Sequence, residues 1–130
     1  MKFSKTFIQK FATVSIALAI VHTIGETYFT IALGQSIVQI LADTIAVFLV
    51  IFGGKIARKN PLKNGILCGA WGFAFCLNYR AFAWRFDEII SGNQDSSITI
   101  TFYILFFSLL ISAVFFTLSM LFNLPKTAIK

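Results

Sequence analysis

The sequence has few charged residues, and this scarcity excludes most classes of soluble protein. Only 12% of the 130 residues are charged, five of them acidic, whereas 58% are hydrophobic and the mean hydropathy is +0.84. A soluble domain carries about a quarter charged residues. The 16 phenylalanines would also be out of place on a surface facing water. The composition therefore predicts an integral membrane protein embedded in a lipid bilayer.

Residues that carry metal, redox and hydrolytic chemistry are also scarce. Cys68 and Cys76 are the two cysteines, and on one helix they would lie roughly 12 Å apart, too far for a mutual disulfide. His22 is the one histidine, so it cannot supply a pair of axial ligands to a haem. The chain contains no HExxH, GxSxG or P-loop motif. We therefore expect no metal, no cofactor and no catalytic residue, and the missing motifs favour a protein that is not an enzyme.

Four long apolar segments occupy most of the chain and predict four membrane-spanning helices. They cover about residues 11–33, 37–52, 62–86 and 98–122. The second is expected to end at Gly53-Gly54, because glycine often ends helices. Asn60-Pro61 is expected to begin the third, and Ser96 or Ser97 to cap the fourth. No linker or second domain interrupts the pattern, so residues 1–130 are predicted to form a single integral membrane domain.

Basic residues are distributed unevenly along the chain and predict its orientation. Most of the 11 Lys and Arg lie before the first span, between the second and third, or after the fourth, at Lys2, Lys5, Lys10, Lys55, Arg58, Lys59, Lys63, Lys126 and Lys130. Cytoplasmic loops carry such an excess. We therefore predict an all-α, antiparallel four-helix bundle, multi-pass in a cell inner membrane, with both termini in the cytoplasm. The same asymmetry explains the net charge of +6, so no nucleic-acid partner is expected.

The ionisable residues inside the spans are predicted to lie in one layer. If each residue adds about 1.5 Å of helical rise, these residues are expected within roughly 10–18 Å of the outer boundary of the membrane. Glu26 lies one helical turn from His22 and shares its face. An ionisable group inside a membrane needs a partner or a function. The predicted proton-coupling or binding site consists of His22, Glu26, Asp43, Asn78, Tyr79 and Arg80.

Other polar residues near this layer are given more ordinary roles. Arg85, Asp87 and Glu88 come at the end of the third span, and we expect them to be solvated charges at the membrane interface. On the fourth span the small hydroxyl residues recur at helical spacing, at Thr101, Ser108, Ser112 and Ser119. Such residues let membrane helices approach closely and hydrogen-bond.

Three interpretations of the polar layer remain open. Arg80 could neutralise Glu26 or Asp43 in a salt bridge that fixes the register of the helices. The layer could instead be a working proton or ligand site, because one arginine cannot neutralise two carboxylates. In the third interpretation the side chains reach separately towards the membrane surface and form no cluster.

These interpretations lead to three functional hypotheses. The first is a proton-linked transporter of a small solute, functioning as a homodimer because four spans rarely enclose a pathway. Its protonatable groups would be Glu26 and Asp43, with His22 tuning them and Arg80 as counter-ion. The second is a non-catalytic accessory or assembly subunit that packs against a partner membrane subunit. The third is a small membrane enzyme acting on a lipid or sterol, with His22 and Glu26 as its acid–base pair.

Overall fold

The computed structural model describes residues 3–33, 37–92 and 95–124, and these residues fold into four α-helices. They are α1 (Lys5–Leu33), α2 (Ile37–Lys59), α3 (Gly65–Ile90) and α4 (Ser96–Asn123). Each helix is long and apolar enough to cross a membrane. The prediction of an all-helical chain with four such helices is confirmed. The basic residues Lys2, Lys126 and Lys130, used above to predict orientation, lie outside the described residues.

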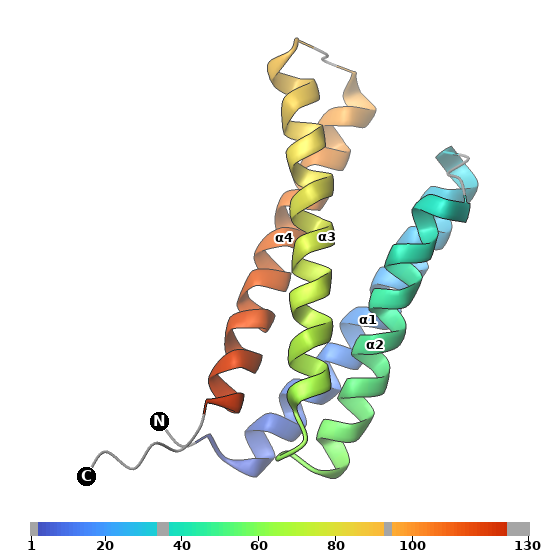
Figure 1. The fold of residues 1–130 in the computed structure, drawn as a ribbon. Coiled ribbons are helices and arrows are strands. Elements are labelled where there is room, and N and C mark those ends of the chain that lie inside the picture. The colour runs from blue at the N-terminus through green and yellow to red at the C-terminus, as the bar shows by residue number, and fades with distance from the viewer. Residues whose placement is uncertain (1–2, 34–36, 93–94, 125–130) are drawn as a thin grey trace.

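The helices form two pairs that meet at one end and separate at the other (Figure 1). α1 packs against α2, α3 packs against α4, and α2 joins the pairs by packing against α3. We call the end where the pairs meet the closed end; it holds the beginnings of α1 and α3 and the ends of α2 and α4. The opposite end, where the pairs diverge, is the open end (Figure 1).

The buried core lies towards the closed end and consists of aromatic and small residues. Phe11 of α1 stacks on Phe115 of α4, with ring centroids 4.9 Å apart, and Trp71 of α3 contacts the same Phe115 ring at 4.7 Å. The Trp71 indole donates a 3.1 Å hydrogen bond to the buried hydroxyl of Ser15 on α1. Because a buried indole N–H needs an acceptor, this bond fixes how α1 and α3 pack together.

Helix α2 does not end at Gly53-Gly54, contrary to the sequence prediction, but continues to Lys59. Both glycines lie where another helix comes close. A Cβ atom on Gly53 would stand 2.7 Å from the backbone nitrogen of Leu67 on α3. A Cβ atom on Gly54 would stand 2.7 Å from the side chain of Ile16 on α1. The glycines therefore let α2 approach both neighbours, which is a common role of small residues between membrane helices.

The turns at the starts of α3 and α4 also differ from the sequence prediction. Asn60 and Pro61 do not begin α3. The Asn60 side chain accepts a 3.1 Å hydrogen bond from the Leu62 backbone N–H in a turn before the helix. The cap of α4 is Asp95 rather than Ser96 or Ser97, and its carboxylate accepts a 2.9 Å hydrogen bond from the Ser97 backbone N–H. In both turns a short polar side chain satisfies a backbone donor.

The outside of all four helices carries large apolar side chains that no other part of the described chain covers. Water would reject a surface of this kind, whereas hydrocarbon accepts it. Those that are at least 60% exposed include Ile24, Tyr28, Phe48, Ile90, Ile100 and Phe107. The surface is therefore that of a protein embedded in lipid.

Replacing Gly53 with alanine should destabilise the protein, because the added methyl group would collide with the backbone of α3. Overpacking of this kind costs about 1–3 kcal/mol. The matched control is Gly69→Ala on α3, where a Cβ atom would have nothing within 4 Å. Removing a helical glycine there should stabilise the protein by up to about 1 kcal/mol. Thermal unfolding in detergent measures both variants. Equal effects at the two positions would contradict the close approach of α2 and α3.

The Asp95 cap should make the stability of the protein depend on pH. Hydrogen bonds from Ser97 hold the pKa of the Asp95 carboxyl below its ordinary value. Because folding lowers this pKa, the stabilisation is present above the pKa of the unfolded chain and is lost as pH falls through the lowered value. We expect Asp95→Ala to lower the unfolding temperature at neutral pH, and the difference from wild type to shrink in acid. The Asp95→Asn side chain still accepts the hydrogen bond but does not titrate, so the capping contribution in this variant should not be lost as pH falls. A difference between wild type and Asp95→Ala that does not change with pH would refute the ionised cap.

Candidate functional site

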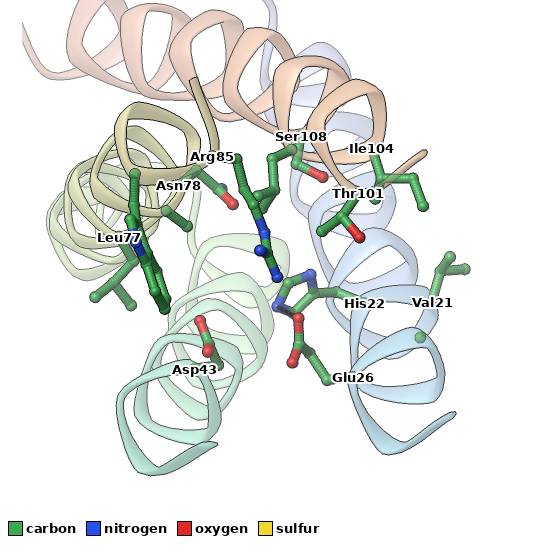
Figure 2. A pocket seen from close by; sticks show the side chains of 14 residues that line it. Val21, His22, Glu26, Asp43, Leu77, Asn78, Arg85, Thr101, Ile104 and Ser108 are labelled. Carbon is green, nitrogen blue, oxygen red and sulfur yellow. Dashed lines mark ion pairs between the residues drawn. The ribbon is translucent and has the colours of Figure 1, made fainter. Parts of the chain in front are cut away.

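A cavity of 390 Å³ lies between the two helix pairs (Figure 2), and its lining residues belong to the halves of the helices towards the open end. All four helices contribute to its lining. The polar and ionisable residues that line it are His22 and Glu26 from α1, Asp43 from α2, Asn78 and Arg85 from α3, and Thr101 and Ser108 from α4. The cavity exists because the pairs are joined towards the closed end, so the halves towards the open end leave space between them.

His22 and Glu26 lie one turn apart on α1 and face the cavity together (Figure 2). The His22 Nε2 and Glu26 Oε1 atoms are 3.9 Å apart, and the two side chains are 35% and 28% exposed. At this distance the groups attract each other when the imidazole is protonated, but they are not hydrogen-bonded. Both side chains are therefore near enough to influence each other and open enough to meet a ligand.

Asp43 projects into the same cavity from α2 (Figure 2). Within the described ranges, no hydrogen-bond donor or basic group pairs with its carboxylate. Glu26 and Asp43 also line a second cavity of 200 Å³ between α1 and α2. The two carboxylates thus form part of a wall that separates two cavities.

The second cavity is lined mainly by apolar and threonine side chains. The hydroxyls of Thr23, Thr27 and Thr44 donate hydrogen bonds to carbonyls one turn earlier on their own helices. The buried Thr30 hydroxyl, which also belongs to this lining, has no partner in the described part of the chain. Because three of these hydroxyl protons are used within the helices, the threonines present mainly lone pairs to the cavity.

The arginine that enters the main cavity is Arg85, not Arg80 (Figure 2). The Arg85 guanidinium points towards His22 and donates a 2.5 Å hydrogen bond to Glu88, one turn further along α3. Arg80 is exposed and does not line the cavity. At about 100° per residue, Arg85 lies on the face of Asn78, seven positions earlier, whereas Arg80 lies on another face. A count from Asn78 along the helix could have identified Arg85.

The structure brings only part of the predicted site together. His22, Glu26, Asp43 and Asn78 line the cavity, whereas Tyr79 is 58% exposed and, like Arg80, lies outside it. The sequence interpretation treated Arg85 as an interfacial charge and did not include it. It also left Trp84, Thr101 and Ser108 out of the site, although the hydroxyl spacing along the fourth span was recognised.

The ion pairs of the described residues do not join one helix to another. His22 pairs with Glu26 within α1, and Arg85 pairs with Glu88 within α3. The salt bridge from Arg80 to Glu26 or Asp43 that would fix the helix register is therefore not formed. Contacts between the helix pairs come from the aromatic and small residues towards the closed end instead. The polar layer is not what holds the fold together.

The titratable residues of the described ranges do not form a metal site. No three His, Cys, Asp or Glu side chains among them are close enough to share an ion. The cavity can instead accept protons and hydrogen-bond donors, because it presents two carboxylates, an amide and two hydroxyl groups.

No known family model, curated protein or solved structure matches this chain.

Ser108 and Ser112 provide a test of whether the cavity contains water. They lie one turn apart on α4, but Ser108 lines the cavity and Ser112 is 1% exposed in the core. In a background with Cys68 and Cys76 replaced by alanine, a charged thiol reagent should label Ser108→Cys at least about tenfold faster than Ser112→Cys. That ratio corresponds to about 1.4 kcal/mol in the barrier. Labelling rates followed by mass spectrometry measure it. Equal rates would mean that water does not reach the cavity.

Proposed function

We propose that this chain is a small multi-pass protein of a cell inner membrane that moves a small solute in exchange for protons. In this proposal the helices form an antiparallel bundle, and the closed end and both termini face the cytoplasm. The basic residues Lys55, Arg58 and Lys59 at the end of α2 support that orientation, because the positive charge of short loops favours the cytoplasmic side. The cavity then opens towards the outer side of the membrane.

The observation that carries the proposal is the pair of carboxylates, Glu26 and Asp43, which face one cavity; among the described residues neither has a permanently charged partner, and Glu26 has only the titratable His22 at 3.9 Å. An acid needed only for structure would be expected to have a fixed partner. Here the nearby guanidinium of Arg85 is hydrogen-bonded to Glu88, and the His22 imidazole lies 3.9 Å from Glu26 without a hydrogen bond. Carboxylates in this condition can bind and release protons as their surroundings change, which is how proton-linked transporters use intramembrane acids.

Transport also requires that the acids be reached from the two sides of the membrane in turn. Glu26 and Asp43 line the main cavity and the smaller one between α1 and α2, and both cavities lie in the half of the bundle towards the open end, so they give access from one side. In the proposed cycle the carboxylates exchange ligand on one side, and a change in the angle between the helix pairs alters which side has access.

A homodimer is the proposed form of the transporter. α1 and α4 meet through the ring contacts of Phe11 with Phe115 and Phe122, which lie towards the closed end. Further out the two pairs diverge (Figure 1). A second copy against this opening would separate the polar lining from hydrocarbon, which rejects ionised groups.

The accessory-subunit alternative assumes that the polar layer only sets helix packing, and the absence of ion pairs between the described helices counts against it. The lipid-enzyme alternative needs His22 and Glu26 to act as a hydrogen-bonded pair, and the 3.9 Å separation gives it no direct support. Transport is therefore the function that the geometry favours.

Glu26→Gln should abolish proton-linked flux, because the amide cannot exchange a proton. Purified protein is reconstituted into proteoliposomes that contain a pH-sensitive dye. An imposed pH gradient drives transport, and the dye reports proton movement after candidate solutes are added. We expect at least about a tenfold loss of flux in the variant, which is a change of about 1.4 kcal/mol in the barrier. Asp87→Asn is the matched control, because Asp87 is an exposed acid outside both cavities.

Unchanged flux in Glu26→Gln would remove Glu26 from the mechanism. Absence of flux in the wild type, together with a lower unfolding temperature in Glu26→Gln, would favour the accessory subunit over the transporter.

A further inference from the structure

We propose that the solute is a small protonated primary amine with an apolar body, and that its ammonium group binds between Glu26 and Asp43. This inference rests on the proposed function, because it names the class of solute that the main cavity would take. Four properties of the cavity support it: its charge balance, its supply of hydrogen-bond acceptors, its apolar wall and its volume.

The charge balance of the cavity favours a cation. Glu26 and Asp43 contribute two carboxylates from one helix pair. The permanent cation in the lining is Arg85, and its guanidinium is hydrogen-bonded to Glu88. His22, 3.9 Å from Glu26, adds a positive charge only when its imidazole is protonated. An anionic solute would have to approach two carboxylates and compete with Glu88 for the arginine. A cation would instead neutralise charges that the described residues leave without a permanent partner.

The hydrogen-bonding groups of the cavity favour a cation that donates several hydrogen bonds. Ionised carboxylates only accept, and together Glu26 and Asp43 offer several lone pairs. The Thr101 hydroxyl donates its proton to the Ser97 carbonyl at 2.7 Å, so towards the cavity it offers lone pairs as well. A primary ammonium carries three N–H donors, whereas a quaternary ammonium carries none. The lining therefore suits a primary amine better than a quaternary one.

The remaining lining favours an apolar body attached to the ammonium group. Leu77 and Trp84 from α3, with Ile104 and Leu105 from α4, line the cavity beside the polar residues. Small-molecule sites are commonly apolar cavities with a few polar groups that orient the ligand, and their volumes run from about 300 to 1,000 Å³. At 390 Å³ the cavity is near the lower end of that range, which suits an amine carrying a single ring or a short branched chain.

Competition for the same carboxylates would couple the amine to protons. A carboxylate must be ionised to bind an ammonium ion strongly, so any proton that it holds is released to solvent when the amine binds. No covalent bond forms, and the positive charge of the amine replaces that of the proton. Amine binding and proton binding are thus mutually exclusive, which is the condition for exchange of one against the other.

The first test compares ligands on the wild-type protein in detergent by isothermal titration calorimetry. All the ligands carry a phenyl ring. 2-Phenylethylamine is compared with the neutral 2-phenylethanol, the anion 3-phenylpropionate, the quaternary N,N,N-trimethyl-2-phenylethylammonium ion and phenylalanine, which adds a carboxylate to the amine. We expect 2-phenylethylamine to bind at least about tenfold more tightly than each of the others, a difference of about 1.4 kcal/mol. Its binding should also release protons in a weakly buffered solution. Equal or tighter binding of the alcohol, the anion or the quaternary amine would overturn the proposal, and so would the absence of proton release. Tighter binding of phenylalanine would show that Arg85 recruits a carboxylate and that the solute is a zwitterion.

The second test locates the ammonium group. Glu26→Gln and Asp43→Asn should each weaken 2-phenylethylamine at least about tenfold, whereas Asp87→Asn should leave its affinity unchanged. The fluorescence of Trp84, which lines the cavity, should change on binding, and this signal should disappear in Trp84→Phe. Unchanged affinity in both cavity variants would refute the assignment. If proton flux depends on Glu26 but the amine does not bind, the protein is a transporter and the assignment of the solute as an amine is wrong. If the amine binds but no flux is seen, the binding site is correct and the proposed transport function is wrong.

Discussion

The close approach of α2 to α3 at Gly53 and Leu67 is the constraint on which the rest of the architecture depends. A glycine allows the backbones to touch there, and the neighbouring Gly54 allows α2 to approach Ile16 of α1. Aromatic packing around Phe11, Trp71 and Phe115 extends the contact to α4. Lipid tails are as apolar as these side chains, so close packing has to supply what the hydrophobic effect supplies in water. The helix pairs are therefore joined where small and aromatic residues fit together, and they separate beyond that point.

The separation of the pairs determines the surroundings of the ionisable residues. Glu26 and Asp43 face a cavity instead of a packed interface, and the described ion pairs connect residues of the same helix. Carboxylates placed in this way are not needed to hold the helices together, so their presence inside a membrane protein calls for another explanation. Exchange of protons against a cationic solute is consistent with their number, with the pairing of Arg85 to Glu88, and with the apolar wall opposite them.

The sequence predicted the four apolar helices well, because hydropathy depends on the chain alone. It predicted less well what depends on neighbours. Gly53 was assigned to the end of a helix, because the sequence cannot show that Leu67 lies against it. Arg80 was preferred to Arg85 because depth along α3 was considered without rotation around its axis. The face that turns inward is set by packing against α2 and α4, so only the relation to Asn78, seven residues earlier, indicated the right arginine. The divergence of the pairs is a tertiary property that no local pattern encodes.

The central claim is that water reaches the carboxyl groups of Glu26 and Asp43 from the cavity. Infrared spectroscopy of the protein in lipid tests it most directly, since the C=O band of a protonated carboxyl shifts when its proton is exchanged for deuterium. The bands are assigned by their loss in Glu26→Gln and Asp43→Asn at acid pH. We predict that both shift as soon as D₂O replaces H₂O. Bands that keep their position for hours after the exchange would mean that the acids are sealed from water, and would contradict the account.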